Sequence, residues 1–390
     1  MISVETALDR IFALVQPAQT ERVALRNAAG RVLAETVSAT RAQPPFDASA
    51  MDGYGVADAD PSAGARYQVV GEAAAGRAWP GHLAAGQAVR IFTGAPVPED
   101  VETVLIQEDV TRNGSEIVLG ENRSSGRNIR PKGGDFDVGF TLEAPRRLGP
   151  ADIGLLAAMN RAEVDVFQRP DVAILSTGDE LVQLGETPRP DQIIASNGPA
   201  LAAMVEEAGG KAWILPNAED CEAALAQGFE LAQGADLILT IGGASVGDHD
   251  LVAGAAERAG FQKAFHKVAV RPGKPVMAGQ LGKALMIGLP GNPVSALISA
   301  RIFVLPALAA LSGLPSAPAP RRPGHLAEAL PENGPREHYM RAEATTEGIK
   351  PLPNQDSSLL SVLARADALI VRPPYDPAKA AGDRVELVDF

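Results

Sequence analysis

The most regular hydrophobic pattern in the chain lies between Pro170 and about Leu314, where short apolar runs alternate with longer amphipathic segments. The apolar runs predict strands at residues 171–176, 211–216, 235–243 and 284–289. The segments between and after them predict helices at residues 198–210, 219–234, 251–260 and 292–305. Strands that alternate with helices of this length predict a parallel sheet with helices on both faces, the doubly wound α/β class.

The segments on either side have a different pattern. Ser3 is a suitable N-cap for an amphipathic helix that places Val4, Leu8 and Ile11, together with Phe12 and Val15, on one face. The chain is then extended to about residue 41. From residue 44 to 138, short β-like runs separated by Gly and Pro predict an inserted β-rich part.

Three local sequences refine this division. Asn113-Gly114 lies between two β-like runs and predicts a hairpin. Gly149-Pro150 opens a further helix. After a Pro-rich linker that begins near Ser316, short strands return as far as Phe390 and predict a small C-terminal β domain.

Charge and cysteine content limit the classes of partner and compartment. The chain has 35 Lys and Arg against 48 Asp and Glu, a net charge of −13, so we expect no binding to nucleic acid, which requires a basic surface. The single cysteine, Cys221, excludes an intramolecular disulfide framework and is typical of the reducing cytoplasm. The first residues show no signal peptide, and Arg301 and Pro306 interrupt the most apolar later stretch, which predicts a buried helix and no membrane span.

Three loops follow strands of the predicted sheet at the edge where open α/β sheets bind ligands. They are Ser176 to Glu180, Ile241 to Asp250 and Gly288 to Ser295. Glycines in the second loop allow successive backbone N–H groups to face an anion, with the following helix N-terminus adding positive potential. Each loop alone is compatible with an ordinary strand-to-helix turn, but three at one sheet edge favour a binding site. None matches a P-loop or a G-x-G-x-x-G fingerprint.

An anionic ligand would need local cations in so acidic a protein. Arg271 and Lys274 lie in the turn Arg271-Pro272-Gly273-Lys274-Pro275, which the prolines stiffen, and we predict that this turn binds an anion. The carboxylates of Glu180, Asp248 and Asp250 are candidates to hold Mg²⁺, which prefers one or two carboxylates together with phosphate oxygens. The scattered histidines have no metal-ligand spacing, and one cysteine cannot build a thiolate zinc site.

Seven motifs occur in the order DASAMDGY, FTGAPVP, GRNIRPKGGD, STGDEL, GGASVGDHD, RPGKP and GLPGNPVSA. Their order and spacing cover nearly the whole chain and resemble the molybdopterin molybdenumtransferase (MoeA-type) family, to which the E domain of gephyrin is similar. The resemblance implies a multidomain α/β subunit and a homodimer in which the inserted region of one subunit faces the doubly wound domain of the other. The implied parts are a discontinuous helical and extended domain (1–43 and 139–169), an inserted β-rich domain (44–138), a molybdopterin-binding-like α/β domain (170–315) and a C-terminal β-barrel (316–390).

The resemblance also implies the site residues. From one subunit these are Asp52, Thr93, Arg130 and Asp135, and from the other Glu180, Ser245, Asp250, Arg271 and Lys274. Asp52, Asp135, Glu180, Asp250 and Lys274 are the expected catalytic residues, with Glu180 and Asp250 as the metal ligands. The expected substrate-binding residues are Thr93, Arg130, Thr177, Gly242, Gly243, Ser245, Arg271, Asn292 and Ser295. Two positions depart from the family pattern: Arg271 stands where lysine is common, and Asn217-Ala218 stands where an acidic pair is frequent.

The implied reaction is Mg²⁺-dependent insertion of molybdate into adenylylated molybdopterin with release of AMP, a step of molybdenum cofactor biosynthesis. A molybdopterin adenylyltransferase and molybdoenzyme maturation proteins are the implied partners. Two other functions stay open. A molybdopterin adenylyltransferase would share the doubly wound domain but would not need residues 1–170 and 316–390. A gephyrin-like scaffold or cofactor carrier would bind a partner without turnover.

Overall fold

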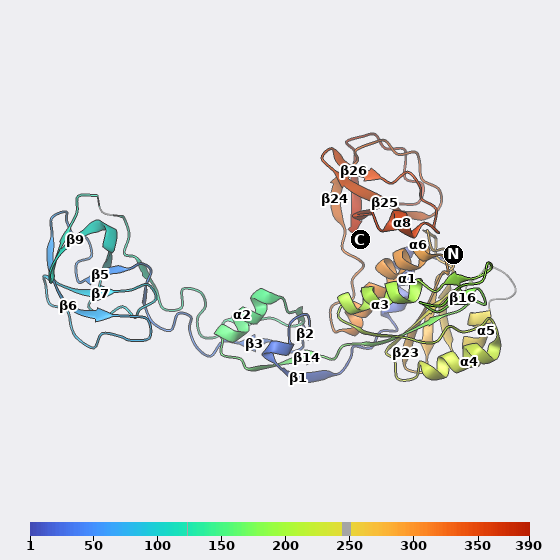
Figure 1. Ribbon diagram of the computed structural model, residues 1–390, viewed down its shortest axis with the longest axis horizontal. Helices are drawn as coiled ribbons and strands as arrows, with labels where there is room; N and C mark the ends of the chain where they lie inside the picture. The colour runs from blue at the N-terminus through green and yellow to red at the C-terminus, as the bar shows by residue number, and fades with distance from the viewer. Residues whose placement is uncertain (123, 244–250) are drawn as a thin grey trace. The chain divides into compact units, whose positions relative to one another are not determined.

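The computed structural model describes residues 1–122, 124–243 and 251–390, and its elements are shown in Figure 1. The chain forms two compact units, which we describe separately. The main unit contains Met1–Ala34, Pro145–Gly149 and Val164–Phe390. The inserted unit contains Glu35–Ala144 and Pro150–Glu163.

The main unit is built on a six-stranded sheet in the order β18-β15-β19-β23-β22-β20. Its strands are β15 (Asp171–Ser176), β18 (Lys211–Ile214), β19 (Leu237–Ile241), β20 (Gln262–His266), β22 (Met277–Leu281) and β23 (Ala284–Leu289). The four predicted strands are present and run parallel. The prediction of a parallel sheet is incomplete, because β22 and β20 add an antiparallel edge. A tight turn at Gly282, with φ +60°, joins β22 to β23 and leaves no room for the crossover that a parallel strand requires.

Helices cover both faces of this sheet, as predicted. They are α3 (Asn197–Glu207), α4 (Glu222–Leu231), α5 (Leu251–Arg258), α6 (Pro293–Ser299) and α7 (Leu305–Leu311). Val172 and Ile174 of β15 pack with α3, α6 and α7 in one core, whereas Ala173 and Leu175 pack with α4 and α5 in another. The alternation follows from the pleat, which turns successive side chains to opposite faces.

Two further helix predictions are confirmed in the main unit. In α1 (Val4–Phe12), the Ser3 hydroxyl accepts a hydrogen bond from the backbone N–H of Thr6 at 3.0 Å, and Leu8 and Ile11 are buried. The run Pro293–Leu311 joins α6 and α7 through a π-helical turn (Ala300–Val304). This run is long and apolar enough to cross a membrane, yet 83% of it is buried inside the protein. It is therefore packed as a core helix.

Two smaller sheets also belong to the main unit. β1 (Thr20–Ala24), β14 (Glu163–Phe167), β2 (Val32–Leu33) and β13 (Arg146–Arg147) form one sheet. The C-terminal sheet has the order β21-β25-β27-β28-β24, with β26 on β25. Its strands are β21 (Val270–Arg271), β24 (Arg322–His325), β25 (Glu337–Thr345), β26 (Gly348–Pro351), β27 (Ala368–Arg372) and β28 (Arg384–Asp389), and α8 (Leu360–Leu363) follows β26. A bridge between Leu326, which follows β24, and Ile349 of β26 brings these two strands together, so the sheet is curled, as the predicted C-terminal barrel requires.

The inserted unit contains a second six-stranded sheet, in the order β8-β5-β7-β6-β10-β9. Its strands are β5 (Gly53–Val56), β6 (Arg66–Ala73), β7 (Gln87–Ile91), β8 (Thr103–Ile106), β9 (Val110–Asn113) and β10 (Glu116–Leu119). The unit also has the pairs β3 (Val37–Ser38) with β12 (Thr141–Leu142) and β4 (Ala48–Ser49) with β11 (Ile129–Arg130), and the helix α2 (Pro150–Ala158). The hairpin between β9 and β10 is confirmed, with Asn113 paired to Glu116 and only Gly114 of the predicted pair at positive φ.

Candidate functional site

A cavity of about 570 Å³ lies in the main unit at the carboxyl ends of β15, β19 and β23. The three loops predicted to meet there are joined by backbone hydrogen bonds. The N–H of Thr177 donates to Ile241 O at 2.9 Å, and the N–H of Gly242 donates to Leu289 O at 3.1 Å. The cavity is therefore formed by backbone that the sheet itself holds in place.

Gly242 and Gly243 allow the loop backbones to approach one another closely. Their φ angles are +93° and +64°, a left-handed region that side chains rarely adopt. A Cβ atom on Gly242 would lie 2.6 Å from Thr177 O, and one on Gly243 would lie 2.1 Å from Cγ2 of Val252. Both predicted substrate-binding glycines line the cavity, and neither position has room for a side chain.

Carboxylates surround the turn at Gly178. Glu180 and Asp220 line the cavity, and the carboxylate of Glu180 lies over Gly178, where a Cβ would be 2.5 Å from Glu180 Oε2. The Oδ1 atom of Asp179 accepts a hydrogen bond from the N–H of Asp220 at 2.9 Å. Partial desolvation, with the negative charges of Asp179 and Glu180, raises the pKa of Asp220.

Sequence reasoning missed Asp220. The family's frequent acidic pair is absent at Asn217-Ala218, but the same loop continues to Asp220, which places a carboxylate at the cavity. The loop is tied down on the cavity side, because the N–H of Gly178 donates to Ala218 O at 3.1 Å. No local sequence pattern indicates Asp220, because its position at the cavity depends on how the loop after β18 packs.

Buried polar side chains form the floor of the cavity. Ser176 is 2% exposed and Thr177 is 4% exposed. Thr177 Oγ1 donates to Ile241 O at 3.3 Å, and Asn197 Nδ2 donates to Gly291 O at 2.7 Å. Among the residues that the structure describes, Asn197 Oδ1 is buried without a hydrogen-bond partner. A ligand with hydrogen-bond donors would satisfy such an acceptor.

The loop after β26 approaches the cavity rim from the C-terminal domain. Asn292 Nδ2 donates to Ser357 Oγ at 3.0 Å, the N–H of Val294 donates to Ser357 O at 3.1 Å, and Ser358 lines the cavity. Ser295 is 5% exposed on α6 and is not among the lining residues. The structure thus brings Asn292 and Ser358 to the rim, whereas Ser295 lies in the core behind it.

The predicted cationic turn adjoins the same cavity through Pro275, which lines it, while Arg271 and Lys274 lie outside the lining. Arg271 is exposed at the end of β21, which pairs with β25 at His338. Burial and the charges of Arg271, Arg336, Arg372 and Arg341 lower the pKa of His338 to about 3. Arg271 is therefore one of four arginines whose positive charges act on His338.

A second, polar cavity of about 530 Å³ adjoins the first and shares Gly178 and Leu181 with it. The loop that carries the paired strands β16 (Leu181–Val182) and β17 (Ile193–Ile194) contributes residues to both. Gln183, Arg189 and Gln192 belong to the second cavity. The carboxyl edge of the sheet thus offers two neighbouring compartments rather than one.

In the inserted unit, the start of β5 and the end of β7 bring Asp52 and Thr93 together. Oδ1 of Asp52 accepts hydrogen bonds from both the N–H and the hydroxyl of Thr93, each at 2.8 Å. These two hydrogen bonds, and to a smaller degree the charge of Arg90, lower the pKa of Asp52. Asp52 is thus an ionised, positioned carboxylate.

The other inserted-unit motifs meet beside this pair. Gly94 N–H donates to Ser49 O at 2.8 Å, and Lys132 N–H donates to Asp47 Oδ1 at 2.7 Å. Arg130 pairs with Ala48 between β11 and β4, and Asp135 donates its N–H to Gln43 O at 3.0 Å. Three motifs that are far apart in sequence, DASAMDGY, FTGAPVP and GRNIRPKGGD, therefore form one surface.

Family models match most of the chain. The MoeA N-terminal region (domain I and II) matches residues 2–160, the probable molybdopterin binding domain matches residues 173–310, and the MoeA C-terminal region (domain IV) matches residues 323–390. The molybdopterin molybdenumtransferase of Haemophilus influenzae is 33% identical over 404 residues, which cover 100% of this chain and 99% of the relative. The chain belongs to the MoeA family.

Other relatives agree with this family. The molybdopterin molybdenumtransferase of Synechococcus elongatus is 33% identical over 411 residues, with 99% of each chain covered. The crystal structure of the molybdopterin biosynthesis moeA protein from Pyrococcus horikoshii OT3 has a TM-score of 0.85 at 25% identity and covers 100% of both chains. This MoeA-family chain is accordingly a transferase of molybdenum cofactor biosynthesis, and the predicted multidomain α/β fold is confirmed.

Three residues singled out in the motif GGASVGDHD, Ser245, Asp248 and Asp250, lie outside the described residues. In the described parts of this MoeA-family chain, no group of three or more His, Cys, Asp or Glu side chains could hold a metal ion. Glu180 is the predicted metal ligand that the structure does place at the cavity. Mg²⁺ needs only one or two protein carboxylates, because phosphate and water oxygens supply its other ligands. The carboxylate of Glu180 is therefore suited to be one of these protein ligands.

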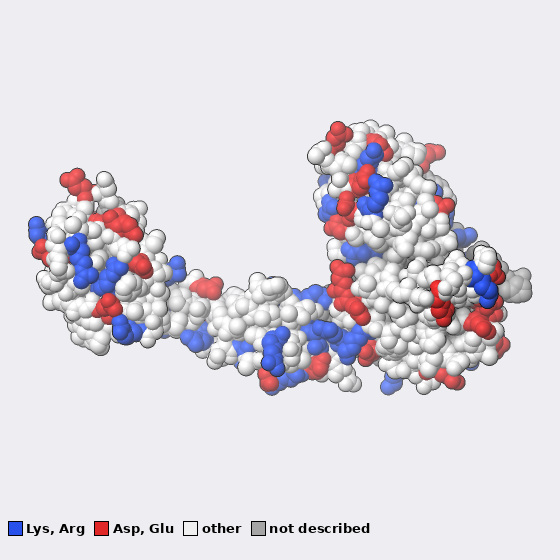
Figure 2. All heavy atoms as spheres, in the orientation of Figure 1, with Lys and Arg blue, Asp and Glu red and all other residues white. Residues whose placement is uncertain are grey.

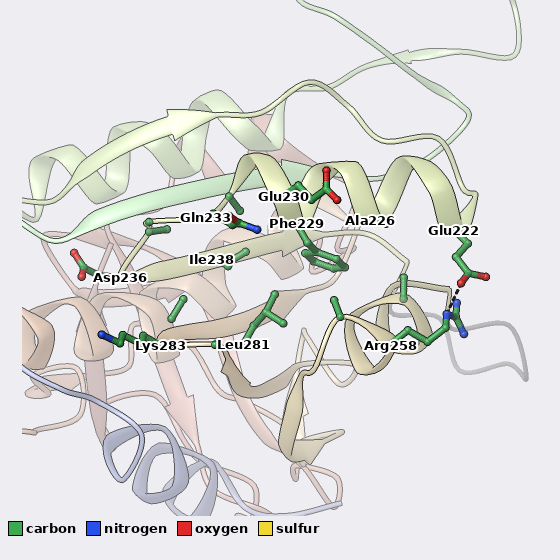
Figure 3. A pocket seen from close by; sticks show the side chains of 17 residues that line it. Glu222, Ala226, Phe229, Glu230, Gln233, Asp236, Ile238, Arg258, Leu281 and Lys283 are labelled. Atoms are coloured by element: carbon green, nitrogen blue, oxygen red, sulfur yellow. Dashed lines mark ion pairs between the residues drawn. The ribbon is translucent and has the colours of Figure 1, made fainter.

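A larger cavity of about 710 Å³ runs along α4 and α5 and shares no lining residue with the carboxyl-edge cavity. Figure 3 shows Phe229, Ile238 and Leu281 in it and the ion pair between Glu222 and Arg258 at one end. Its lining extends to Asp236, which precedes β19, so it reaches the opposite edge of the sheet. It contains none of the predicted site residues.

Surface charge is mixed in this MoeA-family chain. On the face drawn in Figure 2, acidic and basic side chains are interspersed over the main unit. On this face, the acidic residues of a chain with net charge −13 do not form one continuous acidic surface. Local cations such as Arg271 can act on an anion at short range, where the potential is set by near neighbours more than by total charge.

Proposed function

We propose that this chain transfers molybdate to adenylylated molybdopterin and releases AMP. The observation that supports this most is the carboxyl-edge cavity, where three strand-to-helix loops are held together by Gly242 and Gly243 over buried polar groups. Backbone N–H groups at such an edge bind anions, and no charged side chain is required for this. The two adjoining compartments suit a substrate made of a pterin part and a nucleotide part.

The residues of the cavity suit a flat, polar ring system. Ile193, Ile194 and Pro290 supply apolar walls, and Ser176, Thr177 and Asn197 supply hydroxyl and amide groups. A mostly apolar pocket with a few fixed polar groups orients a ligand through its hydrogen bonds. We assign the pterin to this compartment.

Arg271 and Lys274 are assigned to the anionic groups of the substrates. Arginine presents a planar fork that binds an oxyanion through two hydrogen bonds, whereas lysine acts as a point charge. The departure from lysine at Arg271 thus changes a single contact into a forked one. These two cations offset the repulsion that an acidic protein exerts on molybdate and phosphate.

Glu180, together with Asp250, is proposed to hold Mg²⁺. Asp220, which lines the same cavity as Glu180, is a further candidate carboxylate. When bound, the ion would polarise the phosphoanhydride of the substrate. Glu180 and Asp250 would hold the ion, and Ser176 and Thr177 would orient the ring system through their hydroxyl groups. Since the pterin sulfurs exchange ligands on molybdenum, the protein mainly positions the reactants and stabilises charge.

The inserted-unit surface with Asp52, Thr93, Arg130 and Asp135 is proposed to complete the site of a second subunit in a homodimer. An ionised Asp52 and a cationic Arg130 are suited to orient a charged substrate from the opposite side. We further propose a cytoplasmic location, where a molybdopterin adenylyltransferase would supply the substrate and molybdoenzyme maturation proteins would accept the product.

The test uses the purified chain with adenylylated molybdopterin, molybdate and Mg²⁺, and measures AMP. We expect AMP release that requires both molybdate and Mg²⁺, and strong loss of it in Glu180→Gln. Arg66→Met, a change in an exposed ion pair with Glu116, serves as a control with wild-type release. Formation of adenylylated pterin from ATP and molybdopterin would favour the adenylyltransferase instead. Tight binding of the pterin without any AMP release would favour a carrier.

A further inference from the structure

Arg90 lies on β7 directly opposite Tyr54 of β5 and is held in a fixed position by its neighbours. Its guanidinium carbon is 4.8 Å from the ring centroid of Tyr54 and 4.8 Å from that of Phe92. Nη1 donates to Gly53 O at 3.2 Å, and Nη2 donates to Gln107 Oε1 at 2.7 Å. Contacts with two rings and two hydrogen-bond acceptors leave this side chain little freedom.

These contacts fix the backbone at Asp52 through Gly53, its neighbour in sequence, and through Gln107, its hydrogen-bond partner. Gly53, whose carbonyl oxygen accepts from Arg90, follows Asp52 directly in sequence. Gln107, which accepts the other hydrogen bond, donates its own backbone N–H to Asp52 O at 3.0 Å. Arg90 thus holds the two segments that determine where the Asp52 backbone lies.

Arg90 also lies only three residues before Thr93, the hydrogen-bond partner of the Asp52 carboxylate. Phe92, one of its stacked rings, is next to Thr93, whose N–H and hydroxyl both bond to Asp52 Oδ1. Among the described residues, Arg90 is the charged group that acts on the Asp52 carboxylate, and it does so without forming an ion pair with it. The carboxylate therefore keeps its second oxygen for another partner while it lies in a positive field.

We propose that Arg90 is a positioning residue for the reaction, which braces the Asp52–Thr93 pair and fixes a positive charge beside the Asp52 carboxylate. The inference rests on the proposed role of Asp52. Arg90 does not touch the substrate in this account. It acts through Asp52, by holding the direction of that carboxylate and by adding a positive charge that favours its ionised form.

The test compares Arg90→Met, Arg90→Lys, Asp52→Asn and the double variant Arg90→Met/Asp52→Asn in the AMP-release assay across pH. For Arg90→Met we expect release to fall about tenfold or more at neutral pH and the acid limb of the profile to move to higher pH. Arg90→Lys, which keeps the charge but loses the planar fork, should restore the acid limb and only part of the rate. Arg66→Met on β6 of the same sheet is the matched control and should leave both unchanged.

The double variant separates positioning from general damage to the fold. If Arg90 acts through Asp52, Arg90→Met should lower release no further once Asp52 is Asn. Thermal unfolding of each variant identifies any that fails to fold, in which case Arg90→Lys carries the comparison. An unchanged acid limb in Arg90→Met, or full additivity in the double variant, would overturn the inference while leaving the proposed function intact. Wild-type release by Asp52→Asn would instead overturn the role proposed for Asp52.

Discussion

Asp52 and Thr93 make a two-point contact in which one carboxylate oxygen accepts both the backbone N–H and the hydroxyl of the same residue, each at 2.8 Å. The two residues are brought together by the antiparallel pairing of β5 and β7, in which Gly53 lies opposite Ile91. One oxygen is thereby saturated with donors and the other is left for a partner. A carboxylate held in this way is oriented by the fold before any ligand arrives.

Removing the Thr93 hydroxyl tests the contact directly. Thr93→Val keeps the backbone hydrogen bond and the side-chain shape, so we expect AMP release to fall about tenfold with a small change in KM, because a positioning bond and not a binding bond is lost. Thr111→Val, at an exposed position of β9, is the control. Equal rates for wild type and Thr93→Val would contradict the role of this contact.

The same variant has a predictable effect on stability as a function of pH. The folded-state pKa of Asp52 is lowered, so its contribution to stability is present above the ordinary pKa of aspartate and is lost as the pH falls through the folded value. Thr93→Val should therefore lower the melting temperature at pH 7 and have less effect as the pH falls below the folded-state pKa of Asp52. Melting curves of both proteins across this range measure the difference. A gap that stays constant with pH would exclude the ionised carboxylate as its source.

Gly243 is expected to tolerate no side chain. Gly243→Ala would place Cβ 2.1 Å from Val252 Cγ2 at a φ of +64°, whereas Gly260→Ala meets no atom within 4 Å at a φ of +94°. The control should lose about 1–2 kcal/mol from backbone strain alone. Gly243→Ala should lose clearly more in urea unfolding and should fail to bind the pterin substrate. Equal decreases in the free energy of unfolding of the two variants would show that the close contact between Gly243 and Val252 does not affect stability.

Asp220→Asn should separate stability from activity. The folded-state pKa of Asp220 is raised, so its ionised form is disfavoured in the folded protein, and its destabilising effect appears as the pH rises. Replacing it by Asn should raise the melting temperature at pH 7.5, and the gain should shrink as the pH falls through the folded-state pKa of Asp220. If Asp220 also serves the metal site, Mg²⁺-dependent AMP release should fall in the same variant. A more stable protein with unchanged release would limit Asp220 to a structural role.

Much of the main unit could be predicted because local patterns and tertiary structure agree there. The apolar run of β15 and the amphipathic pattern of α3 require the same layered packing, and Ser3 is the cap that its sequence indicates. The strands β22 and β20 were not predicted, because their residues are less uniformly apolar and their antiparallel direction depends on a tight turn at Gly282. Turn geometry is weakly encoded in a hydrophobic pattern.

The parts of the candidate site that lie in loops rich in glycine or proline could be predicted from the sequence. Single side chains that reach the cavity only through tertiary packing could not. The three loops converge as expected, since the carboxyl ends of parallel strands must lie at one edge. Asp220 and Asn197 have no local pattern, because their positions depend on how the loop after β18 and the start of α3 pack. Arg90 was missed for a similar reason, since its stack between Tyr54 and Phe92 arises only when β5 pairs with β7.

We propose that one site takes Asp52 from one subunit and Glu180 from another. Asp52→Asn and Glu180→Gln are co-expressed with different affinity tags, mixed dimers are isolated by tandem purification, and AMP release is measured. Each parent dimer should release AMP far more slowly than the wild type, whereas each mixed dimer should contain one intact site and release AMP at about half the wild-type rate per dimer. Mixed dimers as slow as their parents, or a protein that forms no dimer, would contradict this proposal.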